Sequence, residues 1–296
     1  MSSPAPESRP RIGFVGVGVM GHGMAANLLA AGYSLTAIAH RNRAPVEDLV
    51  SKGAKEASSL SQLAAESDAI VLCVSNSDVV EKVVAELSLD LRPGMMVIDT
   101  GTSSPVSTRK VADQLAALDV SFVEAPVTGG VKQAAAGELG ALVGSDEATF
   151  EEARPLLEAF CAKVHHFGAP GAGNTAKLLN NYMVMGLIAL ITETFSKADQ
   201  ADIDWQKLYD VVICGSADSG ALRRIIGNAV NGDFGGYVFD VNGALKDISY
   251  FCDMAETMDG KSAMAAAVQQ VFADAVAAGH GDRLVSELLA PGVRTT

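Results

Sequence analysis

Residues 11–33 read RIGFVGVGVMGHGMAANLLAAGY, which is a short apolar run, three spaced glycines and then a stretch rich in alanine and leucine. A strand that passes through G-x-G-x-x-G into a helix is the fingerprint of a dinucleotide-binding βαβ unit. In that pattern Gly16 permits a tight turn, Gly18 lets the backbone approach a pyrophosphate, and Gly21 allows close helix packing. The helix N-terminus presents unpaired N–H groups to the phosphates. We therefore predict a nucleotide site here; an ordinary glycine-rich strand-turn-helix is the alternative.

From Arg11 to Phe167 the chain alternates short β-branched or apolar runs with longer amphipathic segments, the rhythm of βαβ units around a mainly parallel sheet. Past Gly173 the β-rich runs stop and helical periods continue. We predict an α/β fold: a disordered tail over residues 1–10, a Rossmann dinucleotide-binding domain over 11–172, and an all-α domain over 173–296 joined to it by a long helix. The predicted strands are Ile12–Val15, Leu35–Ala39, Ala69–Val74, Met96–Ile98, Phe122–Ala125, Ala141–Val143 and Val164–Phe167, and the predicted helices of the first domain are Met20–Ala31, Val79–Leu87, Pro105–Leu118 and Glu147–Phe160.

Composition narrows the classes of partner. The 296 residues include 22 Lys and Arg against 35 Asp and Glu, a formal net charge of −13. This balance repels phosphate backbones and anionic lipid surfaces, so we expect no nucleic-acid or membrane partner. The apolar run from Met183 to Ile191 is too short to span a bilayer. The four cysteines show no metal-ligand spacing, so we expect no metal site and reduced thiols in a cytoplasmic protein.

The turn after the second predicted strand bears on which dinucleotide is bound. About twenty residues past the glycines, an NAD-preferring protein carries an acid for the ribose hydroxyls, whereas this chain reads AHRNR at residues 39–43. A guanidinium matches phosphate geometry through two parallel hydrogen bonds, so Arg41, with His40 and Arg43 beside it, is our candidate for binding a 2′-phosphate. The predicted cofactor is NADP, with NAD as the alternative. These residues could instead be solvated turn residues.

Lys177 and Asn181 lie four residues apart in GAGNTAKLLNN, residues 171–181. Residues at that spacing project from one face of a helix, so an ammonium and a carboxamide would face the same neighbour. The segment that follows, Tyr182–Thr192, is almost wholly apolar and predicts a buried, rigid helix, which suits groups that must hold position during chemistry. The alternative is a lysine on a core helix whose ammonium reaches solvent.

Two further segments are candidates for binding a small acid. In EAPVTGG, residues 124–130, Thr128, Gly129 and Gly130 place a hydroxyl and two successive backbone N–H groups in one turn, which suits a carboxylate. A turn that merely ends the strand is the alternative. Lys246 and Asp247 form a second charged pair in an otherwise apolar segment, where a solvated salt bridge is the alternative.

Together these motifs resemble the β-hydroxyacid dehydrogenase family, of the 3-hydroxyisobutyrate dehydrogenase type, over nearly the whole chain. In order, GFVGVGVMG is similar to that family's cofactor fingerprint, EAPVTGG to its substrate motif, GAGNTAKLLNN to its catalytic motif and ALKDI to a late element. The resemblance implies that Lys177 is the catalytic residue and that Asn181, Thr128, Gly129 and Gly130 hold the substrate. The cofactor residues that it implies are Gly16, Gly18, Val19, Met20, Gly21, Arg41, Val74, Ser75, Thr102 and Lys246.

The implied activity is NADP-preferring hydride transfer between a nicotinamide and a small carboxylate-bearing 3-hydroxy acid or semialdehyde, of the 3-hydroxyisobutyrate or tartronate semialdehyde type. The resemblance also implies a homodimer or homotetramer that packs through the helical domain. The chain departs from the family where Glu124 replaces the usual Asp and Thr128 the usual Ser. Two other functions stay open: an imine reductase of the same fold, which usually lacks the lysine, and a dinucleotide-binding sensor without turnover.

Overall fold

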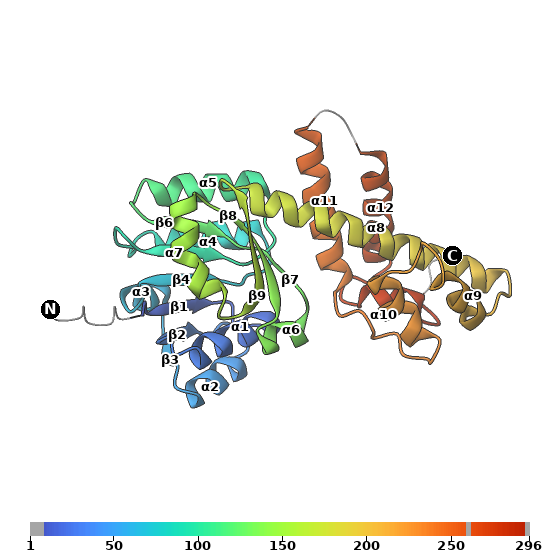
Figure 1. Cartoon of the computed structure of the whole chain (residues 1–296), viewed down its shortest axis with the longest axis horizontal. Helices are drawn as coiled ribbons and strands as arrows, with labels where there is room; N and C mark the ends of the chain where they lie inside the picture. Colours follow the sequence, from blue (N-terminus) through green and yellow to red (C-terminus); the bar gives the residue numbers. More distant parts are fainter. Residues whose placement is uncertain (1–8, 259–261, 294–296) are drawn as a thin grey trace. The chain divides into compact units, whose positions relative to one another are not determined.

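The computed structural model describes residues 9–258 and 262–293, and the chain forms two compact units (Figure 1). The first unit ends at Lys177 and the second begins at Leu178. The predicted boundary after residue 172 lies at the first residue of helix α8 (Ala172–Gln200), whereas the units divide within that helix. Of the predicted tail, residues 1–8 lie outside the described residues.

The first unit is an α/β domain built around one nine-stranded sheet. Its strands are β1 (Ile12–Val15), β2 (Leu35–Ile38), β3 (Lys55–Ala57), β4 (Ala69–Leu72), β5 (Met96–Asp99), β6 (Ser121–Glu124), β7 (Val127–Thr128), β8 (Leu139–Gly144) and β9 (Cys161–Gly168). Its helices before α8 are α1 (Val19–Ala30), α2 (Ala44–Ser51), α3 (Leu60–Ala65), α4 (Ser77–Leu87), α5 (Pro105–Ala116), α6 (Val131–Ala136) and α7 (Glu147–Leu157).

The strand order explains where a ligand would bind. Six strands run parallel in the order β3-β2-β1-β4-β5-β6, after which β8 pairs antiparallel with β6 and β7, and β9 runs parallel to β8. This is the doubly wound order. The connections run in one direction from β1 to β3 and in the opposite direction from β4 to β6, so the switch point lies between β1 and β4. Ligands of such sheets bind beyond the carboxyl ends of the strands at that point. The glycine turn after β1 lies there.

Alternating side chains of the strands pack two layers of helices onto the sheet, one on each face (Figure 1). On β1, Ile12 and Phe14 belong to the core shared with α1, α2 and α7, while Val15 belongs to the core shared with α3, α4 and α5. Parallel strands are buried on both faces, which is why these strands read as nearly continuous apolar runs. The predicted α/β fold with a parallel sheet is confirmed.

Every predicted strand and helix of this unit is present within a few residues, but five short elements were missed. They are β3, β7, α2, α3 and α6, none longer than eight residues. β3 reads KEA and has no apolar run; it forms because it pairs with β2 along the sheet edge. Such short segments owe their structure to neighbouring elements and not to their own propensity.

The second unit is helical. After α8 it contains α9 (Trp205–Val212), α10 (Gly220–Ala229), α11 (Val241–Glu256), α12 (Ala263–Ala277) and the 3₁₀ turn η1 (Val285–Leu289). Its core includes Phe195, Ile225, Ile248 and Phe272, each at most 1% exposed. The helices α9 to α12 begin at Asp or Ser caps whose side chains accept a hydrogen bond from the backbone three residues on.

Helix α8 is unusually long and apolar for a globular domain. By length and composition alone its 29 residues could cross a membrane, although the long core helix of a soluble protein passes the same test. The length comes from the full helix, whereas the sequence prediction considered only its central apolar run. The composition of α8 therefore does not by itself identify its environment.

Candidate active site

The turn between β1 and α1 has the geometry that a pyrophosphate requires. Gly16 adopts φ +96°, and a Cβ built on it would lie 2.2 Å from the carbonyl oxygen of Cys73. A Cβ on Gly21 would lie 2.1 Å from the carbonyl oxygen of Gly16, so both positions exclude any side chain. A Cβ on Gly18, by contrast, would meet nothing within 4 Å. Gly18 precedes α1 and presents open backbone at the positive end of the helix dipole.

The turns that follow β4 and β5 lie at the same edge of the sheet. A Cβ on Gly16 would be 3.3 Å from the Val74 side chain, and one on Gly101 would be 3.0 Å from the Val74 carbonyl oxygen. Val74, Ser75 and Thr102 are therefore gathered beside the glycine turn. The exposed Val19 and the half-buried Met20 follow the glycine turn at the start of α1, so these five predicted cofactor residues lie at or near this edge of the sheet.

The turn after β2 holds the two candidate arginines in different surroundings. The Arg43 guanidinium is 2.9 Å from the Glu56 carboxylate and 3.6 Å from Glu47. Arg43 also lines a hollow of about 430 Å³ at the ends of β2 and β3, together with Glu56. Within the described part of the chain no carboxylate is paired in this way with Arg41, which is exposed. Arg41 is thus the better placed guanidinium for a phosphate.

The predicted carboxylate turn is partly occupied by its own side chains. Gly129 adopts φ +113°, which an L side chain rarely allows. The Gly130 N–H donates to the Gln133 carboxamide oxygen at 3.0 Å, and the Thr128 hydroxyl lies 3.4 Å from the Gly140 carbonyl oxygen. Gln133 thus supplies, in this structure, the acceptor that a carboxylate would supply. A substrate bound to the Gly130 N–H would displace it.

Lys177 and Asn181 lie one turn apart on α8, as the sequence predicts. Lys177 is 9% exposed and Asn181 8%, so neither is a solvated surface residue. Burial of a long cationic side chain is uncommon without a functional or electrostatic reason.

Asn181 is oriented by an aspartate from α11. Its Nδ2 donates to Asp247 Oδ2 at 2.6 Å, and its Oδ1 accepts from Asn180 at 3.1 Å. Asp247 is 4% exposed, and its other oxygen is 3.1 Å from the Lys246 ammonium, which also lies 5.4 Å from the Tyr250 ring centre. The Lys246–Asp247 ion pair is therefore not a solvated salt bridge, because its carboxylate is buried. The Asn181 carboxamide keeps a second N–H hydrogen for a ligand.

Glu124 is a second buried carboxylate to which the sequence analysis assigned no role. It ends β6, is fully buried, and accepts hydrogen bonds from the backbone at the start of α8. Burial raises the pKa of the Glu124 carboxyl, while the hydrogen bonds from Asn174 and from two glycine N–H groups act in the opposite direction. The pairing of Asp247 with Asn181 and of Glu124 with α8 joins residues far apart in the chain, so no local motif reveals it.

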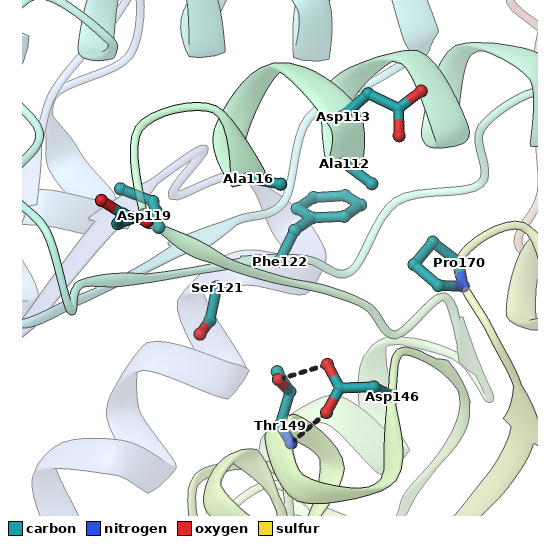
Figure 2. A pocket seen from close by; sticks show the side chains of 10 residues that line it. Ala112, Asp113, Ala116, Asp119, Ser121, Phe122, Asp146, Thr149 and Pro170 are labelled. Atoms are coloured by element: carbon teal, nitrogen blue, oxygen red, sulfur yellow. Dashed lines mark hydrogen bonds between the residues drawn. The ribbon is translucent and has the colours of Figure 1, made fainter.

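A shallow hollow of about 350 Å³ lies elsewhere on the first unit, between α5 and the start of α7 (Figure 2). Its charged lining residues, Asp113, Asp119 and Asp146, are all acidic. Figure 2 shows Asp146, the N-cap of α7, whose carboxylate accepts hydrogen bonds from the backbone N–H and the hydroxyl of Thr149. None of the predicted site residues lines it, and its charge would repel an acidic metabolite.

Comparison with known proteins agrees with this geometry. Residues 11–168 match the family model of the NAD binding domain of 6-phosphogluconate dehydrogenase, and residues 171–291 match that described as NAD-binding of NADP-dependent 3-hydroxyisobutyrate dehydrogenase. The chain is 30% identical to the 2-(hydroxymethyl)glutarate dehydrogenase of Eubacterium barkeri, over 96% of this chain and 95% of that protein. The chain belongs to the β-hydroxyacid dehydrogenase family.

Other members of the β-hydroxyacid dehydrogenase family support this placement. A probable 3-hydroxyisobutyrate dehydrogenase of Mycobacterium bovis is 34% identical over 68% of each chain. The solved structure of Mycobacterium tuberculosis 3-hydroxyisobutyrate dehydrogenase with L-serine has a TM-score of 0.86 and 28% identity, and covers 97% of this chain and 100% of that one. The protein is thus an NAD(P)-dependent oxidoreductase that acts on the CH–OH group of hydroxy acids, and the predicted family is confirmed.

Proposed function

We propose that this dehydrogenase interconverts a small 3-hydroxy acid and its semialdehyde, prefers NADP, and uses Lys177 as its general acid and base. The observation that carries the proposal is the buried pair Lys177 and Asn181 on one face of α8, with the Asn181 carboxamide already oriented by Asp247. Buried, oriented polar groups at a helix face are the arrangement that holds reacting groups in place.

Three of the relatives suggest a class of substrate. The compounds in their names and complexes, 2-(hydroxymethyl)glutarate, 3-hydroxyisobutyrate and L-serine, all carry a hydroxymethyl group on the carbon that bears a carboxylate. A substrate of that kind needs a group that holds the carboxylate and another that exchanges a proton with the hydroxyl. We assign the first role to the Thr128–Gly130 turn and Asn181, and the second to Lys177.

The chemistry divides between the cofactor and the protein. A bound nicotinamide supplies or accepts the hydride. In reduction, the Lys177 ammonium stabilises the negative charge that gathers on the aldehyde oxygen and then donates a proton to it. In oxidation, Lys177 as a neutral amine removes the hydroxyl proton. Anchoring the substrate carboxylate selects which carbon reacts, because it fixes the orientation of the substrate.

The two alternative functions are less well supported. The relatives that match most of this chain are named as dehydrogenases. This favours an active enzyme and disfavours a nucleotide sensor without turnover. The resemblance implies that imine reductases usually lack a lysine at the catalytic position. The presence of Lys177 at this position therefore disfavours imine reduction. Both alternatives give distinct results in a turnover screen.

The screen offers short hydroxy acids and semialdehydes of three to six carbons, and matched imines, with NADPH, NADH and their oxidised forms. We expect turnover of a compound with a hydroxymethyl or formyl group next to a carboxylate-bearing carbon, faster with the phosphorylated cofactor. Imine reduction faster than aldehyde reduction, or NADPH binding without consumption of any compound, would contradict the proposed function.

Replacing Arg41 tests the cofactor preference. Hydrogen bonds to a charged group contribute about 1.5–3 kcal/mol, so Arg41→Ala is expected to weaken NADPH binding by roughly 10- to 150-fold. NADH, which lacks the 2′-phosphate, should be affected by less than ~2-fold. Isothermal titration with both cofactors measures this. Arg43→Ala is the matched control, since Arg43 is held by Glu56, and it should change both affinities alike. Equal losses for both cofactors in Arg41→Ala would remove the reason for assigning NADP.

We further propose that the protein self-associates through an apolar stripe on α8, formed by Leu179, Met183, Leu187 and Leu190. These side chains are 37–71% exposed although they share one face of the helix, and Gly186 among them leaves room for close approach. Contiguous exposed apolar side chains usually mark protein interfaces.

Met183→Glu is expected to shift the sedimentation coefficient toward that of the monomer, whereas Met264→Glu, at an exposed position of α12, should not. A wild-type chain that sediments as a monomer would disprove the stripe as an interface.

A further inference from the structure

The Glu124 carboxylate is held by four hydrogen bonds at the start of α8. Its Oε1 accepts from the N–H groups of Gly171, at 2.5 Å, and Gly173, at 2.9 Å. Its Oε2 accepts from the backbone N–H and the side-chain Nδ2 of Asn174, at 3.1 and 2.7 Å. Glu124 and Asn174 are both fully buried, so water does not compete for these bonds. Both carboxylate oxygens are therefore occupied by hydrogen bonds from residues at the start of α8.

These bonds determine where α8 begins. The first N–H groups of a helix lack partners within the helix. Here the Ala172 N–H donates to the Ala169 carbonyl oxygen before the helix, and the Thr175 N–H makes a helical bond to the carbonyl oxygen of Gly171, four residues earlier. Glu124 takes the N–H groups of Gly173 and Asn174, as a local Ser or Asp cap does elsewhere, and its charge suits the positive helix end. Lys177 follows Asn174 by three residues, a rise of about 4.5 Å. The start that β6 sets for α8 thus also sets the position of Lys177.

Asn174 connects the same cluster to the cofactor edge of the sheet. Its Oδ1 accepts from the Ser103 N–H at 2.9 Å. At the end of β5, Asp99 accepts from the Gly101 N–H at 2.9 Å and from the Ser103 hydroxyl at 3.1 Å. Thr102, a candidate cofactor residue, lies between these two held positions. None of the four residues Asp99, Ser103, Glu124 and Asn174 is more than 2% exposed, so the network is rigid and dry.

Gly144 makes room for the Glu124 side chain. The two residues are direct partners across the β6 and β8 strands. A Cβ built on Gly144 would lie 2.0 Å from Glu124 Oε1 and 2.8 Å from its carboxyl carbon. The resemblance implies an Asp at position 124 in most of the family, one methylene shorter. The longer carboxylate of this chain reaches α8 through the space that a glycine at position 144 leaves.

We propose that Glu124 is a positioning residue for the reaction, which holds the first turn of α8, and with it Lys177, in register with the Thr102 turn through Asn174. This inference rests on the proposed function for the role of Lys177. The network itself is a property of the first unit and is testable without a substrate.

The first test replaces Glu124 by Gln, which keeps the shape but turns one acceptor oxygen into an NH₂ group that faces backbone donors. Because small displacements of a reacting group cost up to about 100-fold, we expect kcat and kcat/KM to fall together by ~10- to 100-fold. Amide hydrogen exchange should accelerate both at residues 171–178 and at residues 100–104. The matched control Glu152→Gln, exposed on α7, should change neither.

Exchange that accelerates only at residues 171–178, with kcat within ~2-fold of wild type, would show a local cap and overturn the proposal. Hydrogen exchange can be measured without turnover. If the wild-type protein were inactive on every hydroxy acid, the proposed function would be refuted, and the exchange rates would still test the hydrogen-bond network around Glu124.

The second test compares the effect of Gly144→Ala in two backgrounds, wild type and Glu124→Asp. Gly144→Ala in the wild-type background places a methyl group against Glu124 Oε1 and should lower kcat by ~10-fold or more. In the Glu124→Asp background the carboxylate recedes, and Gly144→Ala should then cost less than ~2-fold or restore activity. Coupled neighbours show such non-additivity, typically 2- to 150-fold. Equal effects of Gly144→Ala in both backgrounds would overturn the assignment, even if Glu124→Gln fails to fold.

Discussion

Lys177→Ala should lower kcat for the true substrate by roughly 100- to 10,000-fold, the range associated with losing a positioned general acid or base. The loss should appear equally in kcat and kcat/KM, because the lysine assists the transition state more than it binds the substrate. Nucleotide affinity should change by less than ~2-fold, since the glycine turn after β1 binds the pyrophosphate independently. Stopped-flow measurement of NADPH consumption, with isothermal titration of the nucleotide, tests both expectations.

Two further variants sharpen the test of Lys177. Lys177→Arg keeps the positive charge but cannot release a proton in the working range, so it should remain far below wild type in the oxidative direction. Lys82→Ala, at an exposed position of α4, should be indistinguishable from wild type. A Lys177→Ala protein that folds normally and loses less than ~100-fold in kcat would show that another group carries the proton.

Gly18→Ala should separate nucleotide binding from folding. In the structure a Cβ at Gly18 meets nothing within 4 Å, so the substitution should cost at most about 1 kcal/mol, mostly from the poorer helix cap. A bound pyrophosphate would lie against that open backbone, and a methyl group there should weaken NADPH binding by about 1–3 kcal/mol, roughly 5- to 150-fold. Thermal unfolding without ligand and titration of NADPH give the two quantities.

Gly21→Ala is the matched comparison, because its Cβ would lie 2.1 Å from a backbone oxygen. Neither α1 nor β1 can yield without disturbing the core, so this variant should lose more than about 2 kcal/mol of folding free energy as well as nucleotide affinity. If Gly18→Ala bound NADPH as tightly as wild type, the open backbone at Gly18 would not be where the pyrophosphate lies.

The elements that could be predicted from sequence are those whose cause is local. The β1 turn follows from three glycines at fixed spacing, a local pattern, although the Cys73 carbonyl oxygen that crowds Gly16 comes from the end of β4. The four residues between Lys177 and Asn181 place them on one face of α8 whatever packs against it. Long apolar or amphipathic segments were placed correctly for the same reason. Short ones, such as β3 and α6, were missed because pairing and packing with distant segments stabilise them.

The amino-acid order alone thus predicted the α/β fold with a parallel sheet and the family, both confirmed, and it supplied the residues to which we assign the chemistry. What only the tertiary structure decided is how the side chains are held: Glu124 against a helix start some fifty positions later, Asp247 against Asn181 sixty-six positions earlier, and Arg43 against Glu56. Periodicity and motif spacing report on neighbours along the chain. A buried carboxylate takes its partners from whatever the fold brings within hydrogen-bonding distance, and that depends on the packing of the whole domain.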